Sequence, residues 1–204
     1  MRTEDHLALG CYLLSQENVP QLRQHCIAFL IGCIEPDYNL LSYLRGILHH
    51  RKFRGHNAEN SFAFLTRCRS YFEQHKASSA RDFFRLGAML HYAADAFTWP
   101  HNNFWPGSLL EHVRYETALH AVFTEFLRSQ PAGGIASIDE EALHEAYAGA
   151  AHGEEADCRF IFAACSSLFR RGLDLAPAEN AQRANIAMQS WLQEGLAPEA
   201  EAAT

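Results

Sequence analysis

Apolar side chains recur every three or four residues along most of this chain, which is the spacing of helices that bury one face. In residues 79–97, for example, Phe83, Leu86 and Leu90 fall along one side. No segment alternates apolar and polar residues in the manner of a strand. The pattern predicts an all-α bundle of about eight to nine helices, at residues 7–15, 21–34, 40–50, 57–75, 79–97, 106–128, 139–151, 155–173 and 178–194.

Serine and proline residues set the expected ends of several of these helices. Ser79 is a typical N-cap, since its hydroxyl can accept a hydrogen bond from the backbone of the first turn. Pro36 is expected to end the second helix, because proline has no amide hydrogen to donate. Pro106 is expected to start another helix, since proline is favoured in a first turn. We expect residues 1–195 to form a single domain and the Ala- and Glu-rich residues 196–204 to form a frayed tail.

The composition fits a folded, single-domain protein. A chain of 204 residues, with 48% apolar and 20% charged side chains, can bury one substantial core. A formal net charge of −7 argues against a general surface for nucleic acids or anionic membranes. The six cysteines form no Cys-x-x-Cys pair, and neither a leader nor an apolar run of membrane-spanning length is apparent. We therefore expect a cytoplasmic monomer with at most peripheral membrane contact.

Histidine is enriched, with 12 residues, and several lie at spacings that suit a metal ion. His91 and Asp95 are four residues apart, as are His112 and Glu116, so each pair lies on one helical face. The proline of Pro100-His101 cannot extend the first helix, and we expect its histidine to turn towards the second pair. Imidazole and carboxylate ligands without thiolates suit zinc or a similar transition metal in an open, catalytic site.

An interpretation without metal is open at this point. Single His-x-x-x-Asp/Glu pairs arise by chance in a chain rich in these residues, and His91 and Asp95 could form a buried pair. Burying an unpaired carboxylate costs several kcal/mol, so Asp95 needs a cation or a hydrogen-bonding partner in its apolar helix. Two such pairs in consecutive helices, joined by a Pro-His turn, favour the metal site.

The motif that contains both pairs resembles the zinc-dependent phospholipase C family, which shares its all-helical fold with the S1/P1-type nucleases. The family signature Leu-Gly-x-x-x-His-x-x-x-Asp, followed by Pro-His, stands here as Leu86-Gly87-Ala-Met-Leu-His91-Tyr-Ala-Ala-Asp95 and Pro100-His101. Earlier family elements are matched by His6, by Pro36-Asp37 and by His56. The matches run in the family's order from residue 6 to residue 116.

The resemblance implies a centre of two to three zinc ions and assigns ligands to each ion. The ligand sets are His56, His91 and Asp95 with Asp37 alongside for one ion, His6 with Asp95 as a bridge for a second, and His101, His112 and Glu116 for a third.

The second ion depends on the start of the chain. In the family, the amino group and carbonyl of the mature N-terminus complete its ligand shell. Met1 could supply the same atoms here, and without them a two-metal centre remains. His49 or His50 is an alternative to His56, and the other histidines are expected to be solvated or to cap helices.

The activity that the resemblance implies is metal-dependent hydrolysis of a phosphoric ester, most similar to phospholipase C cleavage of a phosphodiester. Asp37 would act as the general base or orient the attacking water. The expected partner is a small phosphoester or a phospholipid, with no stable nucleic-acid partner. Two alternatives are an S1/P1-like nuclease or nucleotidase, which aromatic residues such as Trp105 would favour, and a non-catalytic zinc-binding helical protein.

Overall fold

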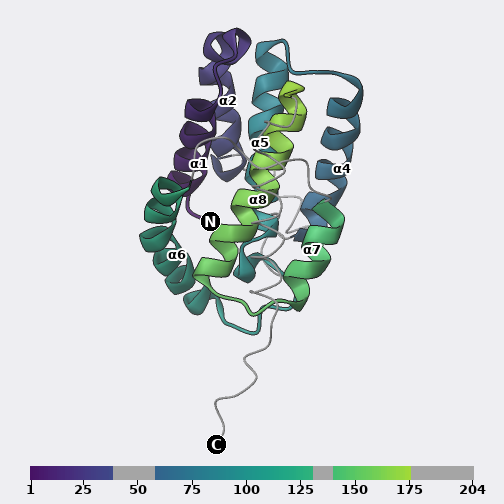
Figure 1. Ribbon diagram of the computed structural model, residues 1–204. Helices are drawn as coiled ribbons and strands as arrows, with labels where there is room; N and C mark the ends of the chain where they lie inside the picture. Colours follow the sequence, from purple (N-terminus) through teal and green to yellow (C-terminus); the bar gives the residue numbers. More distant parts are fainter. Residues whose placement is uncertain (39–57, 131–139, 176–204) are drawn as a thin grey trace, which may run out of the picture.

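The computed structural model describes residues 1–38, 58–130 and 140–175, and these residues form helices and no strands (Figure 1). The all-helical class predicted from the sequence is confirmed, while the predicted helices at 40–50 and 178–194 lie outside the described residues. In the described ranges the elements are α1 (Thr3–Gln16), α2 (Pro20–Tyr38), α4 (Ala58–Gln74), α5 (Ala80–Ala96), the short 3₁₀ helix η1 (Trp99–His101), α6 (Leu109–Ser129), α7 (Glu140–Gly149) and α8 (Glu154–Leu173).

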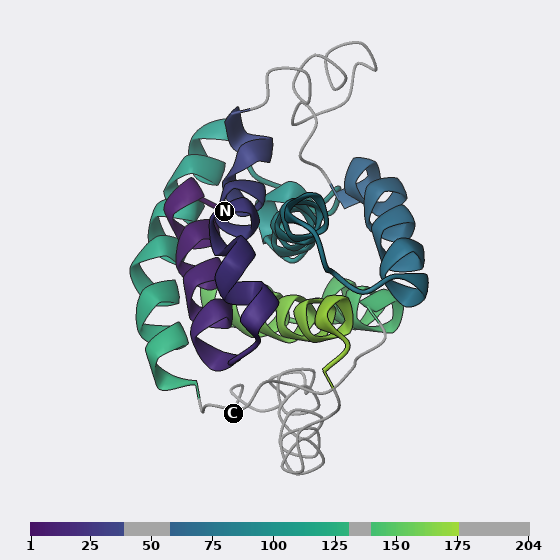
Figure 2. The same cartoon turned by 90° about the horizontal axis from the view of Figure 1, so that it is seen from above.

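Helix α5 runs through the middle of the bundle, with other helices around it (Figures 1 and 2). It packs against α2, α4 and α8. Twelve of its 17 residues are buried, including Phe83, Leu86 and Ala94. His91 and Asp95 are therefore held on a helix that the fold shields from bulk water.

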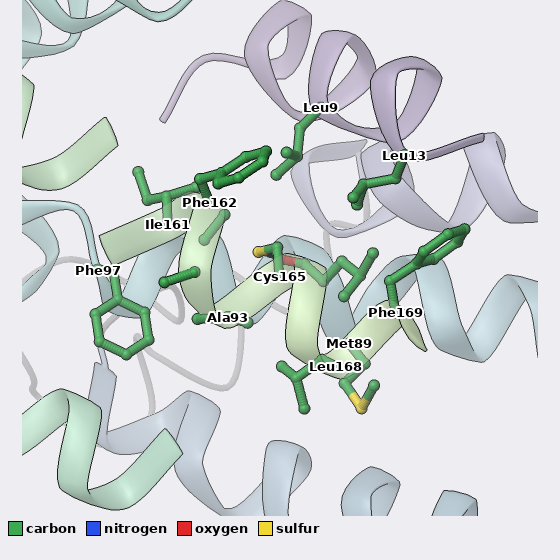
Figure 3. Packing of buried hydrophobic residues seen from close by; sticks show 14 of the residues in the cluster. Leu9, Leu13, Met89, Ala93, Phe97, Ile161, Phe162, Cys165, Leu168 and Phe169 are labelled. Atoms are coloured by element: carbon green, nitrogen blue, oxygen red, sulfur yellow. Dashed lines mark hydrogen bonds between the residues drawn. The ribbon is translucent and has the colours of Figure 1, made fainter. Parts of the chain in front are cut away.

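The apolar core gathers around α5 and α8 (Figure 3). Leu9 and Leu13 of α1 point towards the face of α8 that carries Phe162 and Cys165, and all four side chains are buried. Burial of a large apolar side chain stabilises a fold by about 1.5–3 kcal/mol. The core thus fixes the N-terminal helix against the centre of the bundle.

Two glycines bring α2 and α5 into backbone contact. A Cβ atom at Gly32 would lie 2.1 Å from the carbonyl oxygen of Phe84, and one at Gly87 would lie 2.1 Å from that of Phe29. Only glycine allows this approach. One turn further along, the imidazole Nδ1 of His91 donates a hydrogen bond to the carbonyl oxygen of Cys33, at 2.8 Å. The close crossing therefore places His91 beside the C-terminal turn of α2.

Three helix ends differ from the sequence predictions by three or more residues. Helix α1 begins at Thr3 and not at residue 7, because Asp5 Oδ2 accepts the backbone N–H of Arg2 and stabilises an additional first turn. Helix α2 continues through Pro36 to Tyr38, because a proline in the last turn removes only one backbone hydrogen bond and the packing of α2 on α5 outweighs that loss. Helix α6 begins at Leu109 and not at residue 106. Ser108 accepts a bond from the backbone of Glu111, whose carboxylate accepts the backbone N–H of Ser108 at 2.6 Å, and this reciprocal cap sets the start. The predicted cap at Ser79 is confirmed.

The described helices include none whose length and apolar character would carry it across a bilayer. All six cysteines are free thiols, and Cys33, Cys68, Cys158 and Cys165 are buried, whereas Cys11 is exposed.

Candidate metal centre

Two groups of imidazole and carboxylate side chains meet where α1, α5, η1 and α6 converge. We call His6, His91 and Asp95 the first cluster, and His101, His112 and Glu116 the second cluster. Within each cluster, one nitrogen or oxygen atom from every residue lies within 4.8 Å of the others. The first cluster is entirely buried and the second is partly open.

The first cluster is built from α1 and α5. His6 Nε2 lies 3.3 Å from Asp95 Oδ1, and His91 Nε2 lies 3.4 Å from Asp95 Oδ2. The two imidazole rings stack with their centroids 3.8 Å apart. Because the carbonyl of Cys33 can only accept a hydrogen bond, His91 Nδ1 carries a proton, and in the neutral ring Nε2 is then the basic nitrogen. That nitrogen also lies 3.6 Å from Asp37 Oδ1.

The second cluster combines η1 with the first half of α6. Helix α5 ends at Ala96, and the following turn places His101 so that its Nε2 lies 3.1 Å from Glu116 Oε1. His112 Nε2 lies 3.1 Å from the same oxygen. His101 Nδ1 faces the first cluster, at 3.6 Å from Asp95 Oδ2. His101 is thus turned towards the second pair, where the sequence predicted it, and it also adjoins Asp95.

The amino group of Met1 lies between the two clusters. It is 3.0 Å from Asp95 Oδ1, 3.1 Å from Glu116 Oε1 and 3.3 Å from His101 Nε2. Burial lowers the pKa of this amino group, but the carboxylates of Asp95 and Glu116 outweigh burial and raise the pKa to about 11. Without a metal ion, an ammonium group therefore bridges the buried carboxylate of Asp95 and the partly buried carboxylate of Glu116.

The surroundings fix the protonation of several of these groups. Burial, together with the neighbouring His91, lowers the pKa of His6 to about 4, and burial also lowers the pKa of His101. Burial opposes ionisation of Glu116, but the Met1 ammonium and the bonds from His101 and His112 lower its pKa. At neutral pH the site thus offers a neutral His6 and an ionised Glu116, which are the forms that bind metal ions.

These residues fit zinc by chemistry and by spacing. Zinc holds nitrogen and oxygen ligands at about 2.0–2.2 Å in a tetrahedron, so two ligands of one ion lie roughly 3.3–3.6 Å apart. The separations to Asp95, 3.3 and 3.4 Å, lie in this range, and those to Glu116, 3.1 Å, are slightly below it. His6 Nε2, the nitrogen that faces Asp95, is buried and makes no hydrogen bond among the described residues, which would be a cost if the ring served only structure. With His101, His112 and Glu116 as its protein ligands, a zinc ion at the second cluster would have a fourth position for water or substrate.

A cleft of about 1110 Å³ opens from the second cluster. His101, His112 and Glu116 lie in its wall, together with Met1 and Asp37. The outer lining comes from the segment between η1 and α6 and from the first turns of α6, with Asn103, Trp105, Leu109 and Val113. The candidate centre is thus accessible from one side through a cavity large enough for a small ligand.

The structure brings together eight of the nine candidate ligand residues. They are Met1, His6, Asp37, His91, Asp95, His101, His112 and Glu116. His56 and its alternatives His49 and His50 lie outside the described residues. The resemblance divided His6 and His91 between two ions, whereas the structure stacks them about one carboxylate.

Some supporting residues were missed by the sequence reasoning. The hydroxyl of Thr3 donates to Asp37 Oδ2 at 2.7 Å and so fixes that carboxylate. His120, expected to be solvated or capping, has its Nδ1 2.6 Å from Oδ1 of the buried Asp5, and Asp5 Oδ2 accepts the backbone N–H of Arg2. This pair ties the N-terminal segment to α6. No spacing rule connects residues so distant in the chain.

An all-helical protein with adjoining histidine–carboxylate clusters belongs to a class that includes metal-dependent hydrolases. The profile of one family, the zinc-dependent phospholipases C, matches residues 5–173. The chain therefore belongs to the zinc-dependent phospholipase C family. Searches of curated proteins and of solved structures found no match.

Proposed function

We propose that this protein hydrolyses a phosphodiester of a phospholipid-type substrate at a centre of two to three zinc ions. The observation that carries the proposal is the position of Asp95. Four nitrogen atoms surround its carboxylate: the Met1 amine at 3.0 Å, His6 at 3.3 Å, His91 at 3.4 Å and His101 at 3.6 Å. A carboxylate placed in this way suits a bridge between adjacent cations.

The two clusters divide the ligands between them in this proposal. His6, His91 and Asp95 hold zinc on the buried side, with Asp37 alongside and the Met1 amino group as a further ligand. The second cluster holds zinc at the cleft. Asp95 and Met1 connect the two clusters, because Asp95 also contacts His101 and the Met1 amino group contacts both Asp95 and Glu116.

The reaction that suits this arrangement is attack of water on an anionic phosphodiester. Bound zinc would supply the positive charge that neutralises the phosphate and acidifies a water. Asp37 lies at the cleft, 3.6 Å from His91 Nε2, and its Oδ1 faces the centre while Thr3 holds Oδ2. Asp37 is placed to accept the proton of the attacking water or to orient that water.

An apolar rim at the cleft supports a lipid substrate. Leu109, Leu110 and Val113 begin α6 and are 69%, 61% and 54% exposed, and Leu109 and Val113 also line the cleft. An amphiphile could place its phosphate at the zinc centre while its acyl chains contact these side chains. The net charge of −7 disfavours a polynucleotide, whose phosphates it would repel.

Zinc analysis combined with a substrate panel tests the proposal. The wild-type protein should contain two to three equivalents of zinc and hydrolyse short-chain phosphatidylcholine, and a chelator should abolish the activity. The double variant His91→Ala/Asp95→Ala should lose the zinc of the first cluster and the activity. His75→Ala is the matched control, because His75 is exposed and lies outside both clusters.

Three results would contradict the proposal. Full turnover by the double variant would exclude the centre as the active site. Cleavage of single-stranded DNA without cleavage of the phospholipid would favour a nuclease, for which Trp105 in the cleft wall offers a stacking surface. Bound zinc without hydrolysis of any phosphoester would indicate a non-catalytic zinc-binding protein.

A further inference from the structure

Asp157 is a fully buried carboxylate in the first turn of α8, outside both clusters. Its Oδ2 accepts hydrogen bonds from the backbone N–H of Trp99 and from the hydroxyl of Tyr115, both at 2.8 Å. Its Oδ1 accepts the hydroxyl of Tyr147 at 2.7 Å. One side chain therefore connects η1, α6 and α7 to α8.

Two of these three donors adjoin members of the second cluster. Trp99 lies two residues before His101 in the same short 3₁₀ helix, and Tyr115 directly precedes Glu116 in α6. Asp157 Oδ2 thus holds together the two segments that carry His101 and Glu116, whose facing atoms are 3.1 Å apart. The third donor, Tyr147, is on α7, which contributes no member to either cluster.

The hydrogen bond from the Trp99 N–H to Asp157 is not one that the neighbouring helices could replace. Helix α5 ends at Ala96, and η1 is only three residues long, too short to be stable by itself. The Trp99 N–H lies at the start of η1, where a helix leaves its first amides without intrahelical partners. The carboxylate of Asp157 satisfies that amide and fixes the direction in which η1 leaves α5.

We propose that Asp157 is a positioning residue that holds His101 and Glu116 at the separation needed for zinc binding by the second cluster. This inference rests on the proposed function, because it takes the second cluster to be a zinc site. Asp157 touches neither zinc nor substrate in the proposal, and it acts through Trp99 and Tyr115.

Two substitutions of Asp157 distinguish the effect of its hydrogen bonds on zinc binding from the effect of its side-chain volume. Asp157→Leu keeps a similar shape but leaves the three donors unpaired, and we expect it to weaken zinc binding at the second cluster by about tenfold or more. Asp157→Asn should restore most of the affinity. Its amide oxygen can take the place of Oδ2, and its NH₂ group can donate to the Tyr147 hydroxyl.

A matched pair of tyrosine variants keeps the test decisive even if Asp157→Leu fails to fold. Tyr115→Phe and Tyr147→Phe each remove one hydroxyl from the same carboxylate. Tyr115→Phe should weaken zinc binding at the second cluster, and Tyr147→Phe should leave it unchanged. A merely structural role would make the two variants alike in zinc binding.

The measurement is titration of the metal-free proteins with zinc against a chromophoric chelator. A Glu116→Gln variant identifies which of the titrated equivalents belongs to the second cluster, and urea unfolding reports stability separately. If wild-type protein binds no zinc at the second cluster, both the proposed function and this inference fail. If it binds zinc there but Tyr115→Phe and Tyr147→Phe shift the affinity equally or not at all, only the role of Asp157 is overturned.

Discussion

The glycine contact between α2 and α5 gives a quantitative test of how the fold builds the site. We predict that Gly87→Ala destabilises the protein and disturbs the first cluster. A Cβ atom at Gly87 would lie 2.1 Å from the carbonyl oxygen of Phe29 and 2.8 Å from the backbone nitrogen of Cys33. Ordinary contact begins at 3.4 Å, so the two backbones would have to separate by about 1.3 Å.

The expected magnitude follows from two opposing effects. Overpacking costs about 1–3 kcal/mol, and the upper end applies here because the obstacle is a backbone carbonyl and not a flexible side chain. Alanine in place of glycine inside a helix returns about 1 kcal/mol. We expect a net loss of about 2 kcal/mol, which corresponds to a melting temperature lower by roughly 4–8 °C in a protein of this size. The movement would also lengthen the bond between His91 and the carbonyl of Cys33, which is 2.8 Å now.

Urea unfolding and zinc titration of the metal-free protein measure the two effects. Gly149→Ala is the matched control, because no atom lies within 4 Å of a Cβ atom at that position. It should change stability by no more than about 1 kcal/mol and leave zinc binding unchanged. If Gly87→Ala proves as stable as Gly149→Ala and binds zinc equally well, the close helix crossing does not position His91, and the reasoning is refuted.

Further predictions concern zinc, catalysis, pH and the lipid-facing rim. Removal of zinc with a chelator should lower the melting temperature of the wild-type protein, and added zinc should restore it, because the ions bind only the folded chain. Asp37→Asn should lower kcat by about 10²–10⁴-fold while zinc analysis shows the second cluster still occupied, and unchanged turnover would remove Asp37 from the mechanism. Burial lowers the pKa of His6 from its ordinary value of 6.5 to about 4 in the folded protein. Between pH 4 and pH 6.5 the unfolded chain therefore binds a proton on this imidazole that the folded protein lacks. The metal-free protein should therefore lose stability as the pH falls through that window, by up to about 1.4 kcal/mol per pH unit, and His6→Gln should flatten the slope in urea titrations. Leu109→Asn/Leu110→Asn should raise KM for phosphatidylcholine vesicles by about tenfold and leave a soluble phosphodiester without acyl chains unaffected. Equal effects on both substrates would contradict the role of the rim.

The sequence was most informative where function depends on local spacing. His91 and Asp95 are one helical turn apart, and so are His112 and Glu116, so their common faces follow from helix geometry alone. The turn at Pro100-His101 follows from the restrictions that proline places on the backbone. The all-helical class followed in the same way from apolar periodicity.

Contacts between distant segments could not be predicted from spacing. Nothing in the sequence connects Asp157 with Trp99 and Tyr115, since the three residues meet only once α8 packs against η1 and α6. The pairing of Asp5 with His120 is of the same kind. The predicted end of α2 was wrong for a related reason, because the packing of α2 against α5 outweighs the local effect of Pro36.

The central claim is that the two clusters hold zinc ions on either side of Asp95. X-ray diffraction from zinc-loaded crystals, recorded above and below the zinc absorption edge, tests it most directly. We expect anomalous peaks within bonding distance of His6 and His91 in the first cluster and of His101 and His112 in the second, with Asp95 between them. Crystals that contain zinc but show no peak at either cluster would contradict it.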